Sequence, residues 1–159
     1  MKVLGIDPGS RITGYGVIEK RKNGLVELAR GEIKPAGRSP LSVALAAIYE
    51  QLLEVVDRLS PDAISIEDIF YGKNVKSLIR QGHVRGVAVL AGAMRRIPVF
   101  EYTPLEIKQA VVGYGRAEKS QVQKMVKAIL QLSDMPSVDA ADALAVAICH
   151  INSLKVTPV

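Results

Sequence analysis

The sequence predicts an α/β fold in which helices flank a five-stranded mixed sheet. Three strand-like runs, at residues 2–7, 12–19 and 24–33, are joined by short turns, which is typical of an antiparallel meander. Two later apolar runs, at 63–67 and 97–102, each follow a helical segment. Because a strand reached through a helix usually lies parallel to a neighbour, we expect these two strands to extend the sheet in parallel.

Apolar residues at helical spacing predict five helices around this sheet. The first is expected to begin at Pro40, with Ser39 as its N-cap, and to continue to Leu59, before Ser60-Pro61. A longer helix is expected at about 75–95, and it contains three glycines, each of which costs about 1 kcal/mol relative to alanine. Another backbone, from the sheet or from a second subunit, is therefore expected to approach this helix closely at Gly82, Gly86 and Gly92.

The last three helices follow the fifth strand. Thr103 is expected to cap a short helix that ends near Val112, and Pro136-Ser137 to begin the last helix. Between them, a helix that starts at Glu118 has an apolar and a basic face. The inward face is predicted to consist of Val122, Met125, Val126, Ile129 and Leu130. The outward face is predicted to consist of Lys119, Gln123, Lys124 and Lys127.

The composition indicates a folded protein that does not span a membrane. Of the 159 residues, 48% are hydrophobic, and no apolar run is long enough to cross a bilayer. We expect one domain over residues 1–159 and, since no signal segment follows Met1, a cytoplasmic location. The single cysteine, Cys149, is expected in the core, and His83 and His150 are expected to be structural rather than metal ligands.

Positive charge is concentrated in the middle of the chain. The net charge is +5, yet residues 73–127 contain eleven Lys or Arg against three Glu, which makes this segment +8. Such a concentration is expected of a protein that binds a polyanion, whose phosphates supply much of the affinity. Solvated helix faces would explain the charge about as well, so charge alone does not decide between the two interpretations.

Four carboxylates lie where the predicted topology would bring them together. Asp7 and Glu67 each end an apolar strand. If those strands are parallel neighbours, both carboxylates emerge at the sheet edge where sites form in open α/β folds. Asp139 and Asp142 lie three residues apart at the start of the last helix and so share one face. The alanines around them suit close packing on a sheet, and we expect both aspartates to face inward.

Carboxylates gathered in this way repel one another unless cations lie between them. Their hard oxygen atoms suit Mg²⁺ or Mn²⁺, and two such ions can stabilise the attacking and leaving oxygens of a phosphodiester displacement. Each carboxylate taken singly would more often be structural. Their joint placement beside a basic segment favours a two-metal site.

The motifs that contain these carboxylates closely resemble those of the RuvC family of bacterial Holliday-junction resolvases. The match runs in register over essentially the whole chain. It is carried by Gly5–Ser10 with Thr13–Gly16, by Ile66–Phe70, by Val111–Val122 and by Asp139–Ala145.

The resemblance implies an RNase H-like fold and a homodimer. It further implies an Mg²⁺-dependent endonuclease, with two ions per site and Mn²⁺ as a substitute, that nicks opposed strands of a four-way DNA junction in recombination and repair. Partnership with the RuvA and RuvB branch-migration proteins of a bacterial cytoplasm is implied as well. By position, the family's catalytic metal-binding acids correspond to Asp7, Glu67, Asp139 and Asp142, its important lysines to Lys108 and Lys119, and its aromatic residue at the junction crossover to Phe70.

Physical reasoning assigns matching roles to residues around the acids. Lys119, at a helix start, can bind a phosphate oxygen or stabilise developing charge. Phe70 and Tyr71 can stack on bases that are unpaired near the branch point. Phosphate contacts that set register without reading sequence are expected from Lys73, Lys76, Arg80 and Arg116.

Other enzyme classes fit the sequence less well. An Asp-x-Gly turn also begins the phosphate loop of actin-like ATPases and sugar kinases, but 159 residues cannot supply their second large lobe. The segment 113–120 resembles a P-loop only superficially, because Glu118 stands where the second glycine should be. A non-catalytic junction-binding module would lack at least one acid. A smaller resolvase-like family that processes ribosomal RNA is a closer rival, against which the spacing of Asp139 and Asp142 and the loop at Phe70 argue.

Overall fold

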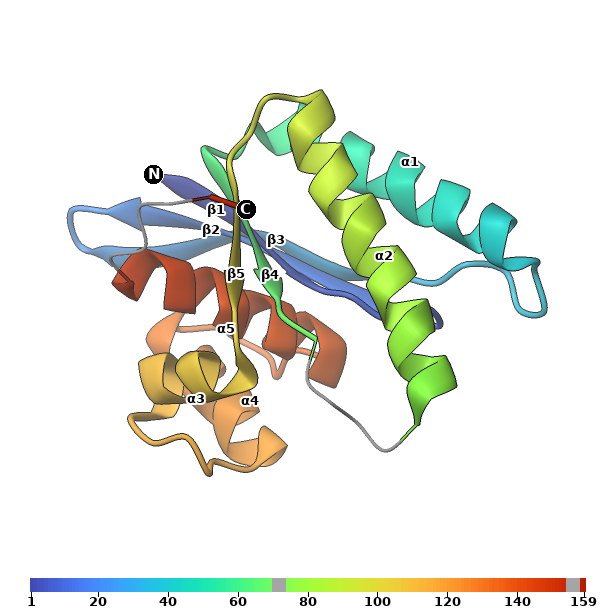
Figure 1. Cartoon of the computed structure of the whole chain (residues 1–159). Helices are drawn as coiled ribbons and strands as arrows, with labels where there is room; N and C mark the ends of the chain where they lie inside the picture. The colour runs from blue at the N-terminus through green and yellow to red at the C-terminus, as the bar shows by residue number, and fades with distance from the viewer. Residues whose placement is uncertain (70–73, 154–157) are drawn as a thin grey trace.

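A five-stranded mixed sheet forms the centre of the molecule (Figure 1). The computed structural model describes residues 1–69, 74–153 and 158–159. In chain order, the strands are β1 (Lys2–Asp7), β2 (Thr13–Arg21), β3 (Gly24–Ile33), β4 (Ala63–Glu67) and β5 (Val99–Tyr102). Their order across the sheet is β3-β2-β1-β4-β5, with the first three antiparallel and both β1–β4 and β4–β5 parallel. The predicted fold class and strand topology are confirmed.

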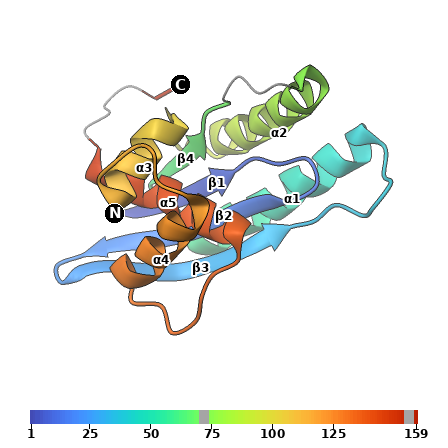
Figure 2. The same cartoon turned by 90° about the horizontal axis from the view of Figure 1, so that it is seen from below.

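Helices cover both faces of this sheet (Figures 1 and 2). On one face lie α1 (Leu41–Leu59) and α2 (Val75–Met94), and on the other lie α3 (Pro104–Val112), α4 (Lys119–Ile129) and α5 (Val138–Asn152). Each layer has its own apolar core. Among the described residues, no helix is long and apolar enough to span a membrane.

Three local details differ from the sequence predictions. The first helix begins at Leu41 with Pro40 as its N-cap, because the Ser39 hydroxyl donates to the carbonyl oxygen of Ala36 at 2.6 Å and so does not cap the helix. The fifth strand begins at Val99 rather than residue 97, because the amide of Ile97 donates to the carbonyl oxygen of Gly92 at 3.0 Å, closing the end of α2. Met125 is 38% exposed, since only a narrow side of α4, at Val122 and Val126, is buried.

The interpretation of Cys149 and His150 as structural residues agrees with their surroundings. Cys149 is fully buried, and His150 is 8% exposed. The His150 ring packs against Phe100, with ring centroids 4.5 Å apart, and its Nδ1 lies 2.8 Å from the hydroxyl oxygen of Tyr102. Both residues are buried on the side of the sheet that α5 covers.

The helix α5 lies unusually close to the sheet because glycines underlie it. A Cβ built on Gly5 would lie 2.0 Å from the carbonyl oxygen of Ala143 and 2.8 Å from the amide nitrogen of Ala147. A Cβ on Gly14 would lie 2.1 Å from the carbonyl oxygen of Asp139. These contacts fix the start of α5 against β1 and β2 and thereby determine where its two aspartates lie.

The glycines of α2 have different surroundings. Gly92 meets the sheet, since a Cβ there would lie 2.5 Å from Cγ2 of Val99. Gly86 is exposed, and no atom of the described residues lies within 4 Å of a Cβ at that position. Tight packing on the sheet is therefore confirmed for Gly92, although its nearest contact is a side chain. A Cβ on Gly82 would lie at an ordinary 3.5 Å from Cδ1 of Ile69, so neither Gly82 nor Gly86 shows the expected close approach of another backbone.

We predict that Gly5→Ala strongly destabilises the protein, because the added methyl group must push α5 away from β1. Overpacking of this kind typically costs about 1–3 kcal/mol, and the 2.0 Å contact with backbone favours the upper end. Urea unfolding followed by circular dichroism measures the change. Gly37→Ala is the matched control, because a Cβ there meets nothing within 4 Å. Equal midpoints for the two variants would contradict the prediction.

Candidate functional site

Two carboxylates lie together at one edge of the sheet. Ile6 on β1 pairs with Ile66 on the parallel strand β4, so Asp7 and Glu67, the last residues of these strands, project from the same edge. Both are partly buried, and their carboxyl groups share a hydrogen bond. A hydrogen bond between two carboxyl groups requires a proton on one of them, which agrees with the raised pKa values of both groups.

The third carboxylate, Asp142, comes from α5. The Ser137 side chain caps this helix by accepting from the amide of Ala140 at 3.4 Å. Asp142 lies in the helix directly before Ala143, whose carbonyl oxygen lies against Gly5. Its side chain is only 17% exposed. The negative charge of Asp142 acts on both Asp7 and Glu67.

This arrangement strongly disfavours full ionisation of the three carboxyl groups. Burial, followed by the charges of Glu67 and Asp142, raises the pKa of Asp7 from 3.8 to about 8. Burial and the charge of Asp142 also raise the pKa of Glu67. Burial raises the pKa of Asp142, although Lys119 opposes the shift. The site therefore has a deficit of positive charge.

Two lysines partly compensate for that deficit. The ammonium of Lys119, at the start of α4, donates to Oδ2 of Asp142 at 3.0 Å. Burial opposes its charged form, but Asp142, Asp7 and Glu67 together outweigh burial and raise the pKa of Lys119. A cavity of about 170 Å³ at this edge is lined by Glu67, Asp142, Lys119 and Lys108 of α3. The charge of Lys108 acts on Glu67 and Asp142. Both lysines thus lie beside the carboxylates.

Local capping fixes the helices that carry these lysines. At the start of α3, the Thr103 hydroxyl oxygen accepts from the amide of Glu106 at 3.3 Å, and the Glu106 carboxylate accepts from the amide of Thr103 at 2.7 Å. At the start of α4, the side-chain oxygen of Gln121 accepts from the amide of Glu118 at 2.8 Å. Most of the Lys119 side chain lies in solvent, with 73% of its surface exposed, although its ammonium bonds to Asp142.

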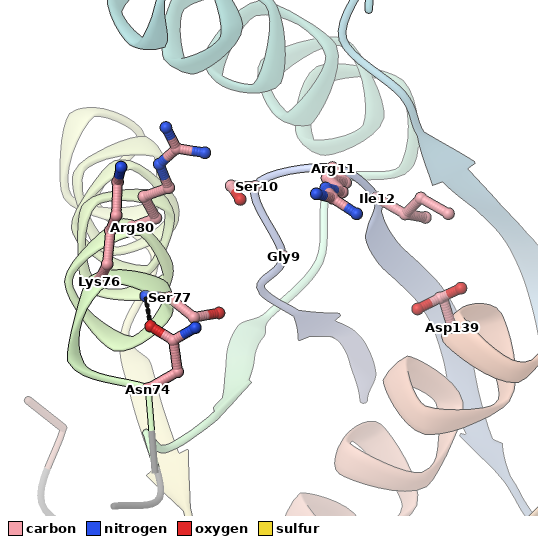
Figure 3. Close-up of a pocket in the computed structure, with 9 residues that line it drawn as sticks. All are labelled: Gly9, Ser10, Arg11, Ile12, Asn74, Lys76, Ser77, Arg80 and Asp139. Atoms are coloured by element: carbon pink, nitrogen blue, oxygen red, sulfur yellow. Dashed lines mark hydrogen bonds between the residues drawn. The ribbon is translucent and has the colours of Figure 1, made fainter. Parts of the chain in front are cut away.

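The fourth carboxylate, Asp139, borders a different cavity. Figure 3 shows its side chain on α5, across the turn between β1 and β2 from the first turns of α2. This cavity of about 530 Å³ is also lined by Lys76 and Arg80 of α2. The charge of Asp139 acts on Asp142. The structure thus brings three of the four predicted acids together and places the fourth beside them.

The expected DNA contacts fall into three groups. Lys76 and Arg80 line the cavity next to Asp139, and Arg116 is exposed in the loop between α3 and α4. Phe70, Tyr71 and Lys73 lie outside the described residues. The turn after β1 also lines this cavity, and sequence reasoning did not predict this. The available signal was Arg11, a basic residue directly after the Asp-Pro-Gly-Ser turn.

The donor set fits a hard divalent cation. Oxygen ligands of like charge, desolvated and crowded, are those that Mg²⁺ and Mn²⁺ prefer, and a bound cation would reverse the upward pKa shifts. Among the described residues, no three His, Cys, Asp or Glu side chains are already arranged to hold a metal ion. Asp7 and Glu67 instead bond to each other, and Asp142 bonds to Lys119. Cation binding would therefore require these side chains to exchange partners.

We predict that the metal-free protein loses stability as the pH rises. Because the pKa of Asp7 is about 8 in the folded state and lies near 3.8 when unperturbed, the folded state retains a proton that the unfolded state releases between these values. Stability should fall across this window by an amount on the order of a few kcal/mol. Urea unfolding in a chelator at pH 5, 6.5 and 8 measures the slope.

Asp7→Asn should flatten this pH dependence and be more stable than the unsubstituted protein at pH 8. Asp134→Asn is the control, because the hydrogen bond from Arg30 lowers the pKa of Asp134, so this residue titrates below the window. A slope unchanged by Asp7→Asn would show that Asp7 is not the group that holds the proton.

Comparison with known proteins identifies the family. The family model for the crossover junction endodeoxyribonuclease RuvC matches residues 3–150. The enzymes of that name from Geotalea uraniireducens and Ruminiclostridium cellulolyticum are 50% and 53% identical to this chain, over 96% of it and 90% and 93% of their own lengths. The structure of Thermus thermophilus RuvC in complex with a Holliday junction substrate superimposes with a TM-score of 0.89 and 33% identity, covering 95% of this chain and 93% of that one.

These matches run through both strands that end in carboxylates and through the helix that carries Asp139 and Asp142. They also confirm the expected fold, since the similar structure is that of a RuvC protein. On this combination of sequence, fold and coverage, the chain belongs to the RuvC family of crossover junction endodeoxyribonucleases.

Proposed function

We propose that this protein is an Mg²⁺-dependent endonuclease that resolves four-way DNA junctions by paired nicks in opposed strands, in recombination and DNA repair. The observation that carries the proposal is the convergence of the partly buried Asp7, Glu67 and Asp142 at one sheet edge, beside Lys119 and Lys108. The junction complex of the similar Thermus thermophilus protein supports the choice of substrate.

The four carboxylates would hold the metal. Asp7, Glu67 and Asp142 would supply oxygen ligands at the sheet edge, and Asp139 would supply a further ligand from the same helix face as Asp142. When bound, two Mg²⁺ ions, for which Mn²⁺ can substitute, activate a water molecule and polarise the scissile phosphodiester.

The lysines would act on the substrate. The exposed Lys119 ammonium, which donates to Asp142 in this structure, would bind a non-bridging phosphate oxygen and stabilise the charge that develops there. Lys108 would add a second fixed positive charge on the wall of the same cavity. Lys76, Arg80 and Arg116 would contact backbone phosphates, together with Lys73, while Phe70 and Tyr71 would stack on bases at the branch point.

Paired nicks require two active sites, and the exposed face of α2 suits a homodimer. Four large apolar residues recur along this face and are half or more exposed, namely Val75 (66%), Ile79 (55%), Leu90 (50%) and Met94 (58%). Gly86 lies between them, with nothing of the described chain above it. A second copy of this helix could cross here at short distance, because the glycine leaves room for a backbone and the apolar residues would be buried.

The family relationship supports two further expectations. We propose that the protein works with the RuvA and RuvB branch-migration proteins and that it acts in the cytoplasm of a bacterium. The curated relatives of known source are bacterial enzymes, which is consistent with this location.

Asp7→Asn should retain binding to a four-way junction and lose cleavage, because it removes one metal ligand and leaves the basic surfaces unchanged. We expect the cleavage rate to fall by about a hundredfold or more, with junction affinity within about threefold. Gel assays with a synthetic junction, with and without Mg²⁺, measure both. A second readout is the melting temperature at pH 8, which Mg²⁺ should raise for the unsubstituted protein and leave nearly unchanged for the variant. Cleavage by Asp7→Asn at the normal rate would refute the metal assignment.

Leu90→Asp should convert the proposed dimer into a monomer, because an unpaired carboxylate would be buried where two apolar faces meet. Sedimentation equilibrium gives the mass directly. Val43→Asp on α1 is the control, since Val43 is 54% exposed and lies on a different helix. The same mass for Leu90→Asp and the unsubstituted protein would rule out this dimer face.

A further inference from the structure

A second cavity lies on the far side of the turn between β1 and β2. It has a volume of about 480 Å³ and lies between this turn, the loop from β3 to α1, and α2. Its charged lining residues are Arg11, Arg38 and Arg80, and no Asp or Glu lines it. We call this cavity the arginine pocket.

These three arginines differ from most others in the described chain. Arg21, Arg30, Arg85 and Arg95 each form an ion pair with a carboxylate. Arg11, Arg38 and Arg80 have no carboxylate within salt-bridge distance among the described residues. Three like charges that converge without a counter-ion repel one another, so the pocket is electrostatically complementary to an anion.

The backbone around the pocket also favours an anion. Arg38 has a φ of 61°, a left-handed conformation that is uncommon for a residue other than glycine. The turn that contains it is closed by Ser39, whose amide and hydroxyl both donate to the carbonyl oxygen of Ala36. Leu41 and Ala44 place the first turn of α1 in the pocket wall, and this helix start has no side-chain cap and no acidic residue in its first turn. Its free N–H groups add to the positive potential.

The arginine pocket continues the cavity that contains Asp139. Ser10, Arg11 and Arg80 line both cavities, so the two adjoin along the turn after β1. In Figure 3, Arg11 and Ser10 lie between Asp139 on one side and Arg80 on the other. A DNA strand with a phosphodiester at the carboxylate edge could pass over this turn and place a later phosphate among the arginines.

We propose that the arginine pocket binds a backbone phosphate of the junction DNA at a distance from the bond that is cut. This inference rests on the proposed function and adds Arg11 and Arg38 to the DNA-contacting residues. Arginine suits the task because its planar guanidinium forms bidentate hydrogen bonds to phosphate oxygens. Such a contact sets the register of the strand relative to the carboxylates without reading its sequence.

The first test measures junction affinity over a range of salt concentrations. Arg38→Ala and Arg11→Ala should each weaken binding about threefold to tenfold and reduce the slope of log affinity against log salt by about one. Arg58→Ala is the matched control, because it removes the same charge from an exposed position at the opposite end of α1. Circular dichroism and thermal melting verify that each variant is folded. Equal affinities and slopes for Arg38→Ala and Arg58→Ala would overturn the proposal.

The second test locates the phosphate. Junctions that carry a single neutral methylphosphonate linkage are scanned position by position. At one position distant from the cleavage site, the neutral linkage should weaken binding by the unsubstituted protein. The same linkage should have little effect on binding by Arg38→Ala, because the two changes remove the same interaction. If the losses simply add at every position away from the cleavage site, Arg38 does not contact a phosphate.

A DNA-independent measurement separates failure of this inference from failure of the proposed function. Inorganic phosphate should shift the NMR signals of the Arg38, Ser39 and Leu41 amides in the unsubstituted protein and have a much smaller effect in Arg38→Ala. A protein that shows these shifts but does not prefer a four-way junction to linear duplex retains the pocket and refutes the junction assignment. A protein that cleaves junctions but shows no phosphate-induced shifts retains the function and refutes the pocket.

Discussion

Close contact between α5 and the sheet is the constraint on which the candidate site depends. Beneath this helix there is no room for a side chain at positions 5 and 14, both of which are glycine. On the helix, Ala143 and Ala147 have small side chains. Because the backbones approach so closely, Asp142 lies near the ends of β1 and β4. A layer of larger side chains between the helix and the sheet would hold Asp142 farther from them. The same contact desolvates the carboxyl groups and raises their pKa values. Stability and chemistry are thus linked through one packing interaction.

The cluster of acids has a cost that the rest of the protein must offset. Like charges at a partly buried edge oppose folding in the absence of a cation. Lys119 relieves part of this repulsion by bonding to Asp142, yet most of its side chain remains in solvent. The same exposure would let the Lys119 ammonium contact a phosphate oxygen at this edge in the proposed reaction.

The sequence was sufficient to predict the strand topology and the convergence of Asp7, Glu67 and Asp142, because each depends on local signals. Apolar runs end in turns or caps, and parallel strands expose their carboxyl ends at one edge. It was not sufficient for features determined by tertiary contacts. The cavity bordered by Asp139, the bonding of Ser39 to Ala36 and the exposure of Met125 depend on which elements pack together. Periodicity alone does not contain that information.

The distribution of positive charge shows the same limit and has a functional consequence. The middle of the chain is +8, but Arg85 is paired with Glu101, and Arg95 bonds to Asp57 of α1 at 2.6 and 2.9 Å. These arginines contribute to the packing of α2 and are not free to bind phosphate. Arg11 and Arg38 lie outside that segment, yet the fold places them beside Arg80. Counting charges along the sequence therefore overestimates one part of the proposed DNA-binding surface and overlooks another. The relevant quantity is the number of basic side chains that folding leaves without a carboxylate partner on one continuous surface.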